Sequence, residues 1–291
     1  MKSLSGEKNG MVKRLVQTGS SLIFLGLASS VLACTYEEGN HYYEMKQYDK
    51  AYACFMQPDN LKNPKAQNTL GIMYRHGFGV EKDDKKAVEW YTRAAMNGND
   101  RAQYNLAMCY ETGWGVKRDY DKAIAWYLKA AEQGNSSAEL NIGYLYDEGM
   151  SIWRRDRQKA LYWYRRAARH GDTDAMTNLG HAYYLGTGVQ KNLNHAIQYY
   201  LMAAEKGHAK AQYLAGDACE KGHGIERDCE RALFWYKKAA ENGEIMAMDR
   251  LSRIYGTGLC GQAENHEESM KWLKKSGAIK RDILKNSSGK K

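Results

Sequence analysis

A segment of about 36 residues repeats along most of this 291-residue chain. The repeat is clearest in an alanine pair that recurs every 36 or 37 residues, as Ala94-Ala95, Ala130-Ala131, Ala167-Ala168, Ala203-Ala204 and Ala239-Ala240. A period of this size is typical of arrays of small supersecondary units. One such unit cannot enclose its own apolar face, so neighbouring units must stack to complete a core.

Each unit carries the signals of two helices. The second clear unit begins with Ala102, and Leu106 follows four residues later, which places both side chains on one helix face. The turn Gly113-Trp114-Gly115 must end this helix, because glycine adopts positive φ at low cost. A second helix starts near Asp119, a suitable N-cap, and ends at Gly134. The sequence therefore predicts an all-α solenoid of antiparallel helix pairs.

An aromatic pair, such as Trp126-Tyr127, precedes the alanine pair of each unit. We expect the tryptophan to fill the space between the helices and the small alanines to allow close approach. A buried aromatic side chain removes about 150–250 Å² from water, worth about 4–6 kcal/mol gross at about 25 cal/mol per Å². The loss of the Trp126 side chain should then cost about 3–5 kcal/mol.

The pattern A-x-x-x-L-G-x-x-Y-x-x-G-x-G-V, followed by K-A-x-x-W-Y-x-x-A-A-x-x-G, resembles the Sel-one-like repeat family, a relative of the tetratricopeptide repeat. The resemblance implies about six such repeats over residues 65–277. Residues 37–60 resemble a plain tetratricopeptide unit, so residues 34–64 should form an N-terminal capping helix pair. Two turns lack their second glycine, at Met150-Ser151 and Leu259-Cys260, and should differ in shape.

The N-terminus carries an export signal. Residues 11–34 combine a basic start, a short apolar run and a small residue before Cys34. This predicts a secretory signal peptide over residues 1–33, with Met11 as a plausible true start. Val31-Leu32-Ala33-Cys34 is either a lipobox, which would attach a lipid to Cys34 and the protein to the outer membrane, or an ordinary cleavage site. We favour a soluble periplasmic product.

The six cysteines fit an oxidising compartment, because their number is even. An antiparallel helix pair would bring Cys34 near Cys54. Cys219, Cys229 and Cys260 belong to the last two units, where a bond from Cys219 to Cys229 would clamp one glycine turn. The sequence does not fix the pairing, and Cys54 and Cys109 fit equally well as small core residues.

Charge and motifs give no sign of nucleic-acid binding. The net charge of +9 falls by three when residues 1–33 are removed, and the remaining Lys and Arg alternate with Asp and Glu. No basic aromatic motif is present, so we expect no nucleic-acid partner. The basic excess lies near the C-terminus, where residues 278–291 should form a flexible tail.

The sequence also predicts no enzyme, metal site or cofactor. The histidines near glycine turns lack metal-binding spacing, and we expect them to be solvated. They are His76, His170, His208 and His223. Cysteine-rich exported members of the resembled family have been linked to penicillin binding or weak β-lactamase activity. The S-x-x-K signature of such enzymes occurs here only in residues 5–8, 287–290 and 288–291, off the repeats.

Resemblance to tetratricopeptide stacks places a partner-binding groove along the first helices of the units. The implied groove residues are Asn68, Arg75, Tyr104, Met108, Tyr144, Asp147, His181, Tyr184, Tyr213, Asp217 and Arg253. This mixture of aromatic, methionine and charged side chains is typical of protein interfaces. The alternative is that some of these tyrosines pack between adjacent units.

Three aromatic residues at turn tips are further candidate anchors for a partner: Phe78, Trp114 and Trp153. Loops also fold such residues back onto a stack. We therefore expect an exported, non-enzymatic scaffold that binds a protein of unknown identity in the bacterial envelope. The alternatives are an immunity protein against a secreted toxin, a host-factor-binding protein, or a penicillin-binding repeat protein.

Overall fold

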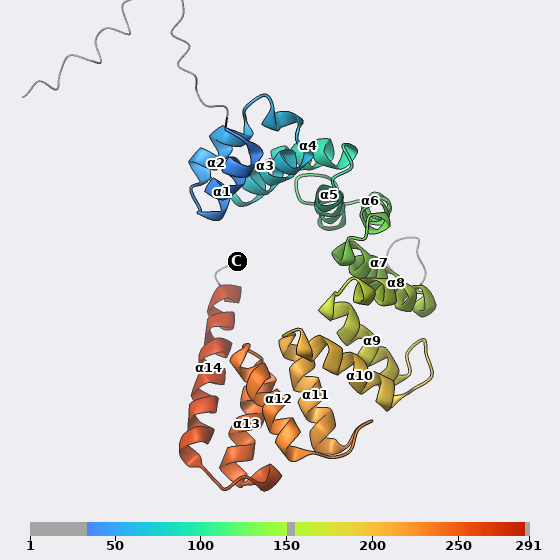
Figure 1. Ribbon diagram of the computed structural model, residues 1–291, viewed down its shortest axis with the longest axis vertical. Coiled ribbons are helices and arrows are strands. Elements are labelled where there is room, and N and C mark those ends of the chain that lie inside the picture. The colour runs from blue at the N-terminus through green and yellow to red at the C-terminus, as the bar shows by residue number, and fades with distance from the viewer. Residues whose placement is uncertain (1–33, 150–154, 289–291) are drawn as a thin grey trace, which may run out of the picture.

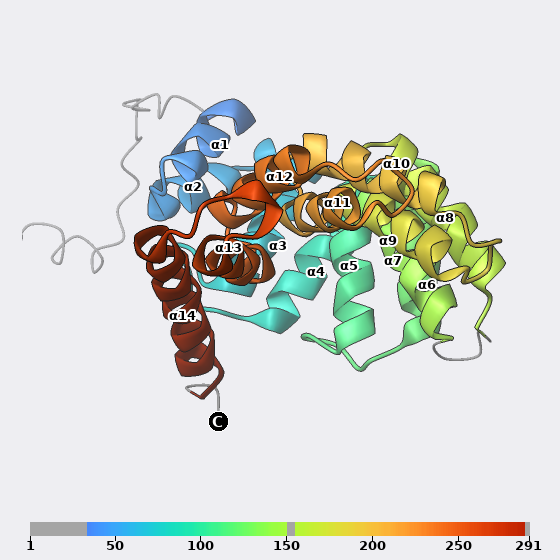
Figure 2. The same cartoon turned by 90° about the horizontal axis from the view of Figure 1, so that it is seen from below.

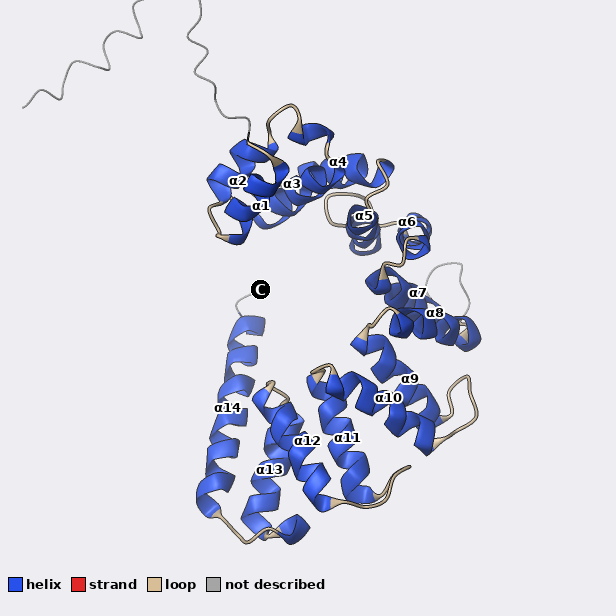
Figure 3. Cartoon of the chain, viewed as in Figure 1, coloured by secondary structure: helices blue, strands red, loops and turns tan. Residues whose placement is uncertain are grey.

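The computed structural model describes residues 34–149 and 155–288 (Figure 1). These residues form fourteen α-helices and two 3₁₀ turns, without a strand (Figure 3). The expected all-α class is confirmed. The predicted signal peptide, Met150 and Trp153 lie outside the described residues. No helix in the described ranges is long and apolar enough to cross a membrane.

The helices form consecutive antiparallel pairs. The N-terminal pair is α1 (Tyr36–Glu44) and α2 (Tyr48–Phe55), which the 3₁₀ turn η1 (Asn60–Lys62) joins to the repeats. The six following pairs are α3 (Pro64–His76) with α4 (Asp84–Met96), α5 (Asp100–Thr112) with α6 (Tyr120–Glu132), α7 (Ser136–Glu148) with α8 (Arg157–Arg169), α9 (Thr173–Leu185) with α10 (Leu193–Glu205), α11 (Ala209–Lys221) with α12 (Cys229–Glu241), and α13 (Ile245–Thr257) with α14 (His266–Ser288). The turn η2 (Leu259–Gly261) lies between α13 and α14.

The pairs stack in chain order, because each helix packs mainly on the helices before and after it. The stack curves into an open arc (Figure 1), and the view from below shows that the helix pairs do not all lie in one plane (Figure 2). Helices α5 and α7 lie toward the inside of the arc, and α6 and α8 toward the outside (Figure 1). The first helices of these two units therefore line the concave side of the arc.

Capping residues set the helix ends as the sequence predicts. The carboxylates of Asp83, Asp119, Asp156 and Asp228 accept backbone N–H groups at the start of their helices. Left-handed glycines, Gly113 with φ of 82° among them, end the first helices. The first helices also have caps that sequence reasoning missed: Asn63, Asn99, Asn135, Asp172, His208 and Glu244.

The tyrosine of each aromatic pair, rather than the tryptophan, closes the helix pair. Tyr127 and Tyr236 are fully buried. In four units the ring packs against a glycine of the first helix; a Cβ added at Gly143, for example, would lie 2.4 Å from the ring of Tyr164. The small positions, in the same repeat register, are Gly71, Ala107, Gly143, Gly180, Gly216 and Ser252, although the last unit carries Leu273 in place of the tyrosine. Only a small residue lets the two helices approach over the tyrosine ring.

The expectation that tryptophan fills this space is therefore wrong for most units. Trp126 is only half-buried, and Lys129 Nζ lies over its ring at 4.2 Å from the centroid. Successive helical residues point about 100° apart, so only one member of the pair can face the first helix. The tryptophan covers the edge of the core from outside, although Trp235 and Trp272 in the last two units are buried.

A buried amide beside the first alanine links neighbouring units. Gln103 donates from Nε2 to the carbonyl of Ala95 at 3.2 Å and accepts from Gln133 at 2.9 Å. Gln212 makes the equivalent two bonds, donating to the carbonyl of Ala204 in the preceding unit and accepting from Asn242. These bonds satisfy buried carbonyls at the ends of the second helices, which would otherwise cost about 1–3 kcal/mol each.

Over its described part, residues 278–288, the C-terminal segment is helical, which corrects the predicted flexible tail there; residues 289–291 lie outside the described residues. Helix α14 continues to Ser288. Asp249 holds it to α13, because it accepts from Ser276 Oγ at 2.5 Å and from Lys280 Nζ at 2.8 Å. No proline interrupts the segment, and Gly277 is tolerated inside the helix.

The packing predicts unequal roles for the two adjacent aromatics. Tyr127→Ala should lower the free energy of unfolding by about 3–5 kcal/mol, because it leaves a cavity between α5 and α6. Trp126→Ala should cost only about 1–2 kcal/mol, because part of that ring remains in water when folded. Denaturant unfolding followed by circular dichroism measures both values. A larger loss for Trp126→Ala than for Tyr127→Ala would contradict this packing.

Candidate protein-binding groove

The inner side chains of the first helices line a series of hollows. The largest of the hollows described here, about 770 Å³, lies between α1, α3, α5 and the start of α7. Its walls include the predicted groove residues Asn68 and Tyr104, together with Tyr36, Tyr43 and Arg101. The walls carry both polar amides and aromatic rings, as expected for a surface that accepts a polypeptide.

Two further hollows continue along the row. Tyr144, Asp147 and His181 line one of about 290 Å³, and His181 also borders the next, of about 130 Å³, with Tyr184 and Asp217. Tyr144 keeps 42% of its surface exposed. The structure thus brings seven of the predicted groove residues to hollows along adjoining first helices.

The remaining predicted residues have different environments. Arg253 is exposed on α13. Met108 and Tyr213 are half-buried and pack against the core, and Tyr213 lies 5.7 Å from the ring of Tyr236. Arg75 is held by Asp84 at 3.0 Å and belongs to the stack more than to an open surface. Asn68 is also largely buried and accepts from Asn105 at 2.9 Å, although it borders the largest hollow.

Hydroxyl groups of the buried tyrosines help to order the groove floor. Tyr127 Oη donates to Glu111 at 2.5 Å and accepts from Asn141 of the next unit at 3.0 Å. Burial, with the nearby Glu111 charge, raises the pKa of Tyr127, so the hydroxyl stays protonated and keeps donating. Glu220 repeats the arrangement by accepting from Tyr236 at 2.8 Å and pairing with Arg250 of the next unit. These bonds fix the side chains between which a partner would bind.

The described turn-tip aromatics fold onto the stack. Phe78 is half-buried, with its ring stacked on Tyr48 at 4.6 Å between centroids and on His76 at 5.2 Å. Trp114 keeps 39% of its surface exposed, but Arg75 Cζ lies 3.6 Å from its ring centroid. Both residues therefore join neighbouring units. The third candidate, Trp153, lies outside the described residues.

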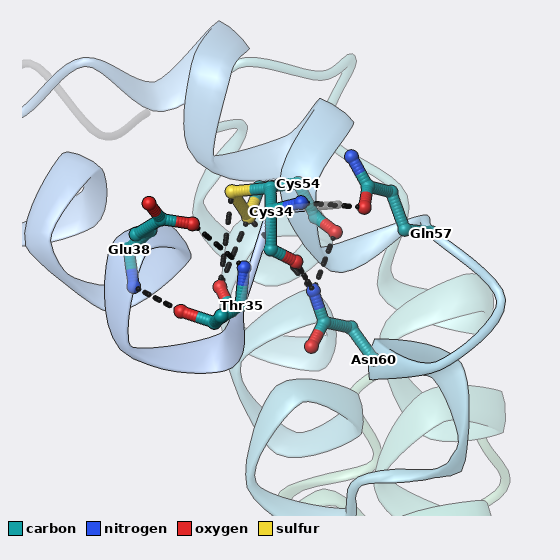
Figure 4. The surroundings of a disulfide bond; sticks show 6 residues. All are labelled: Cys34, Thr35, Glu38, Cys54, Gln57 and Asn60. Atoms are coloured by element: carbon teal, nitrogen blue, oxygen red, sulfur yellow. Dashed lines mark hydrogen bonds between the residues drawn. A yellow bond between two sulfur atoms is a disulfide. The ribbon is translucent and has the colours of Figure 1, made fainter. Parts of the chain in front are cut away.

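One disulfide closes the N-terminal pair. Cys34 and Cys54 are bonded, with Cα atoms 5.4 Å apart (Figure 4). Asn60 Nδ2 donates to the carbonyls of both cysteines at 2.8 Å, and Gln57 accepts from the Cys34 N–H at 2.8 Å. The expected proximity of Cys34 and Cys54 is confirmed. A sulfur in this bond cannot also carry a lipid through a thioether.

The second disulfide corrects one of the predicted pairings. Cys229 bonds to Cys260, with Cα atoms 5.1 Å apart, and not to Cys219. Cys219 is a buried free thiol on the core side of α11, as is Cys109 on α5. Cys229 begins α12, where it meets the turn η2, whose Cys260 adopts φ of 57°. The bond therefore ties the last two units together.

Two turn histidines belong to polar clusters: His170 remains exposed to solvent, as expected, whereas His208 is half-buried, which corrects its expected solvation. Glu139 is fully buried and occupies the position of the linking glutamine. Arg166 Nε lies 2.9 Å from its carboxylate, and His170 Nδ1 lies 2.7 Å from the other oxygen. Because a carboxylate cannot donate, Arg166 bonds the carbonyl of Ala131 at 3.0 Å instead. His208 caps α11 by accepting a backbone N–H at 3.1 Å.

No group of three or more His, Cys, Asp and Glu side chains within residues 34–149 and 155–288 is arranged to hold a metal ion. The candidate site consists of hollows along the inner row, whose side chains are ordered by contacts with their neighbours.

Comparison with known proteins agrees with the repeat boundaries. The Sel1 repeat model matches residues 64–99, 100–135, 136–172, 173–208, 209–244 and 245–278. Each match starts at the first residue of a first helix, from α3 to α13. No curated protein matches the chain.

Solved structures of Sel1 repeat proteins also resemble this chain. A Sel1 repeat protein from Oxalobacter formigenes is 44% identical, with a TM-score of 0.80, over 84% of this chain and 100% of that protein. A protective antigen of uropathogenic Escherichia coli is 33% identical, with a TM-score of 0.70, over 84% of this chain and 53% of its own length. An immunity protein from Pseudomonas aeruginosa, at 18% identity and a TM-score of 0.50 over 84% of this chain and 82% of that one, shares the fold alone. Repeat matches and structural relatives together show that the chain belongs to the Sel1 repeat family.

Proposed function

We propose that this protein is a non-enzymatic scaffold of the bacterial envelope, which binds a partner protein along the inner side chains of its first helices. The observation that supports it is the row of hollows that runs over adjoining units from Tyr36 to Asp217. A repeat array presents such a row as one rigid surface. A polypeptide could contact several hollows at once, and rigid presentation lowers the entropic cost of binding.

Tyr144 is the best single anchor of this surface. Its ring is 42% exposed, yet it is oriented by an edge contact with the buried Tyr164, at 5.7 Å between centroids. Asp147 beside it is held near Arg157, at 3.8 Å. An oriented, partly exposed tyrosine beside a charge is a common form of interface hot spot.

Two disulfides support a location in an oxidising compartment such as the periplasm. The Escherichia coli relative is described as a protective antigen, which is compatible with an exported protein. We propose that cleavage before Cys34 yields the mature chain and that Cys34 enters its disulfide rather than receiving a lipid. Roles as an immunity protein or a host-factor binder are particular forms of this binding function, distinguished by the identity of the partner.

The groove proposal predicts different effects for two exposed tyrosines of one unit. Tyr144→Ala combined with Asp147→Ala should abolish capture of a partner from periplasmic extract, because both side chains border one hollow. Tyr162→Ala, on α8, removes a tyrosine that is 54% exposed but borders none of the groove hollows described above, and it should leave capture intact. Immobilised protein with mass spectrometry of the bound fraction measures this. Equal capture by all three proteins, each with unchanged helicity, would contradict the groove.

The cysteine assignment predicts how the thiols titrate. Burial raises the pKa of Cys109 to about 11 and also raises that of Cys219, so both thiols stay protonated at pH 8. The native mature protein should therefore react slowly with a thiol reagent, and denatured protein should show two thiols. Three thiols, together with an N-terminal mass increase of acyl size, would show that Cys34 is lipidated and Cys54 is free.

A further inference from the structure

A separate hollow of about 410 Å³ lies between the second helices α8 and α10. The rings of Tyr183 and Tyr199 form one wall, stacked at 5.8 Å with an angle of 11° between their planes. Arg165 and Arg169 from α8 line it as well, and His195 from α10 contacts the edge of Tyr183 at 5.0 Å. This hollow shares no lining residue with the groove hollows.

The two arginines of this hollow have no ion-pair partner among the residues that the structure describes. None of the residues that line it is acidic. Within the described chain, neither Arg165 nor Arg169 forms an ion pair or hydrogen bond, whereas Arg166 between them is held by Glu139. Burial raises the pKa of Tyr199, and the positive charges of Arg165 and Arg169 oppose that rise. Two unpaired guanidinium groups thus border a partly apolar space.

The repeat register shows that this hollow is specific to one junction. At the position of Arg165 the other units carry Thr92, Leu128, Leu201, Lys237 and Lys274. At the position of Arg169 they carry Met96, Glu132, Glu205, Glu241 and Ala278. No other unit has a cation at both positions, so stacking of the units does not require the arginine pair.

Helix α10 departs from the repeat at the same place. Tyr199 occupies the position where every other unit has a tryptophan. Met202 stands where every other unit has an arginine or lysine, the residue that lies over that tryptophan in most of them, as Lys129 does at 4.2 Å. A tyrosine ring is smaller than an indole, and Met202 places no cation over it. These two replacements leave open the space that Arg165 and Arg169 border. Four departures from the repeat therefore converge on one hollow.

From these observations we infer a second binding site, which accepts an acidic segment of a partner protein between α8 and α10. Guanidinium groups bind carboxylates in pairs of parallel hydrogen bonds, and they are common interface anchors. The tyrosine rings, Met202 and Leu179 would cover an apolar residue next to the carboxylate. A peptide with acidic and apolar side chains fills both parts of the hollow, whereas a free phosphate would leave the apolar walls uncovered.

The test uses a fluorescein-labelled peptide that alternates glutamate with leucine, and its glutamine counterpart, in anisotropy titrations with the mature protein. The hollow variant is Arg165→Leu with Arg169→Glu, which introduces the residues that the preceding unit carries at the same register. The control variant is Lys237→Leu with Lys274→Glu, which changes the net charge by the same amount elsewhere. Circular dichroism checks that each variant keeps its helicity and melting temperature.

The site predicts that the glutamate peptide binds the unmodified protein and the control variant alike. The hollow variant should bind it at least tenfold more weakly, and the glutamine peptide should bind poorly to all three. Equal weakening in both variants would show general charge attraction and would overturn the site. Binding of inorganic phosphate that the glutamate peptide fails to displace would also overturn it, in favour of a small-anion site. Neither result bears on the groove, whose residues are unchanged.

Discussion

The stack depends on one contact that recurs in its units, a buried tyrosine ring packed against a small residue of the facing helix. At Gly143 there is no room for even a methyl group, since a Cβ would lie 2.4 Å from the ring of Tyr164. This contact sets the distance between the two helices of a pair, and the paired helices set the surface on which the next unit packs. The tyrosine hydroxyl extends the same contact toward the groove, where Glu111 and Asn141 bind it.

The ends of such an array lack a neighbour on one side, and both disulfides lie there. Cys34–Cys54 closes the N-terminal pair, and Cys229–Cys260 joins the last two units. A crosslink restricts the unfolded chain and stabilises the fold by about 2–4 kcal/mol. The interior units need no crosslink, because neighbours on both sides complete their cores. Repeated residues thus maintain the stack, and residues that depart from the repeat are free to serve binding.

Periodicity alone predicts the fold class, the helix order and the aspartate caps, because these depend on local residue types and spacing. It does not identify which aromatic of Trp126-Tyr127 is buried, since that depends on the rotation of one helix against another. Periodicity also does not show that Glu139 meets Arg166 and His170, because these side chains come from different parts of the stack. The small residue that follows Leu70 or Ile142 in the sequence is the signal that could have revealed the tyrosine contact. The sequence could not pair Cys229 with Cys260, because that pairing depends on the shape of the turn η2, in which Cys260 lies.

Hydrogen exchange of the protein with and without its captured partner tests the central claim, that the first helices form the binding surface. The account predicts slower exchange on complex formation in peptides from α5, α7 and α9, because bound polypeptide restricts the opening of the helices it covers. Peptides from α6 and α12 should change little. Protection confined to second helices, with α5, α7 and α9 unchanged, would contradict the account.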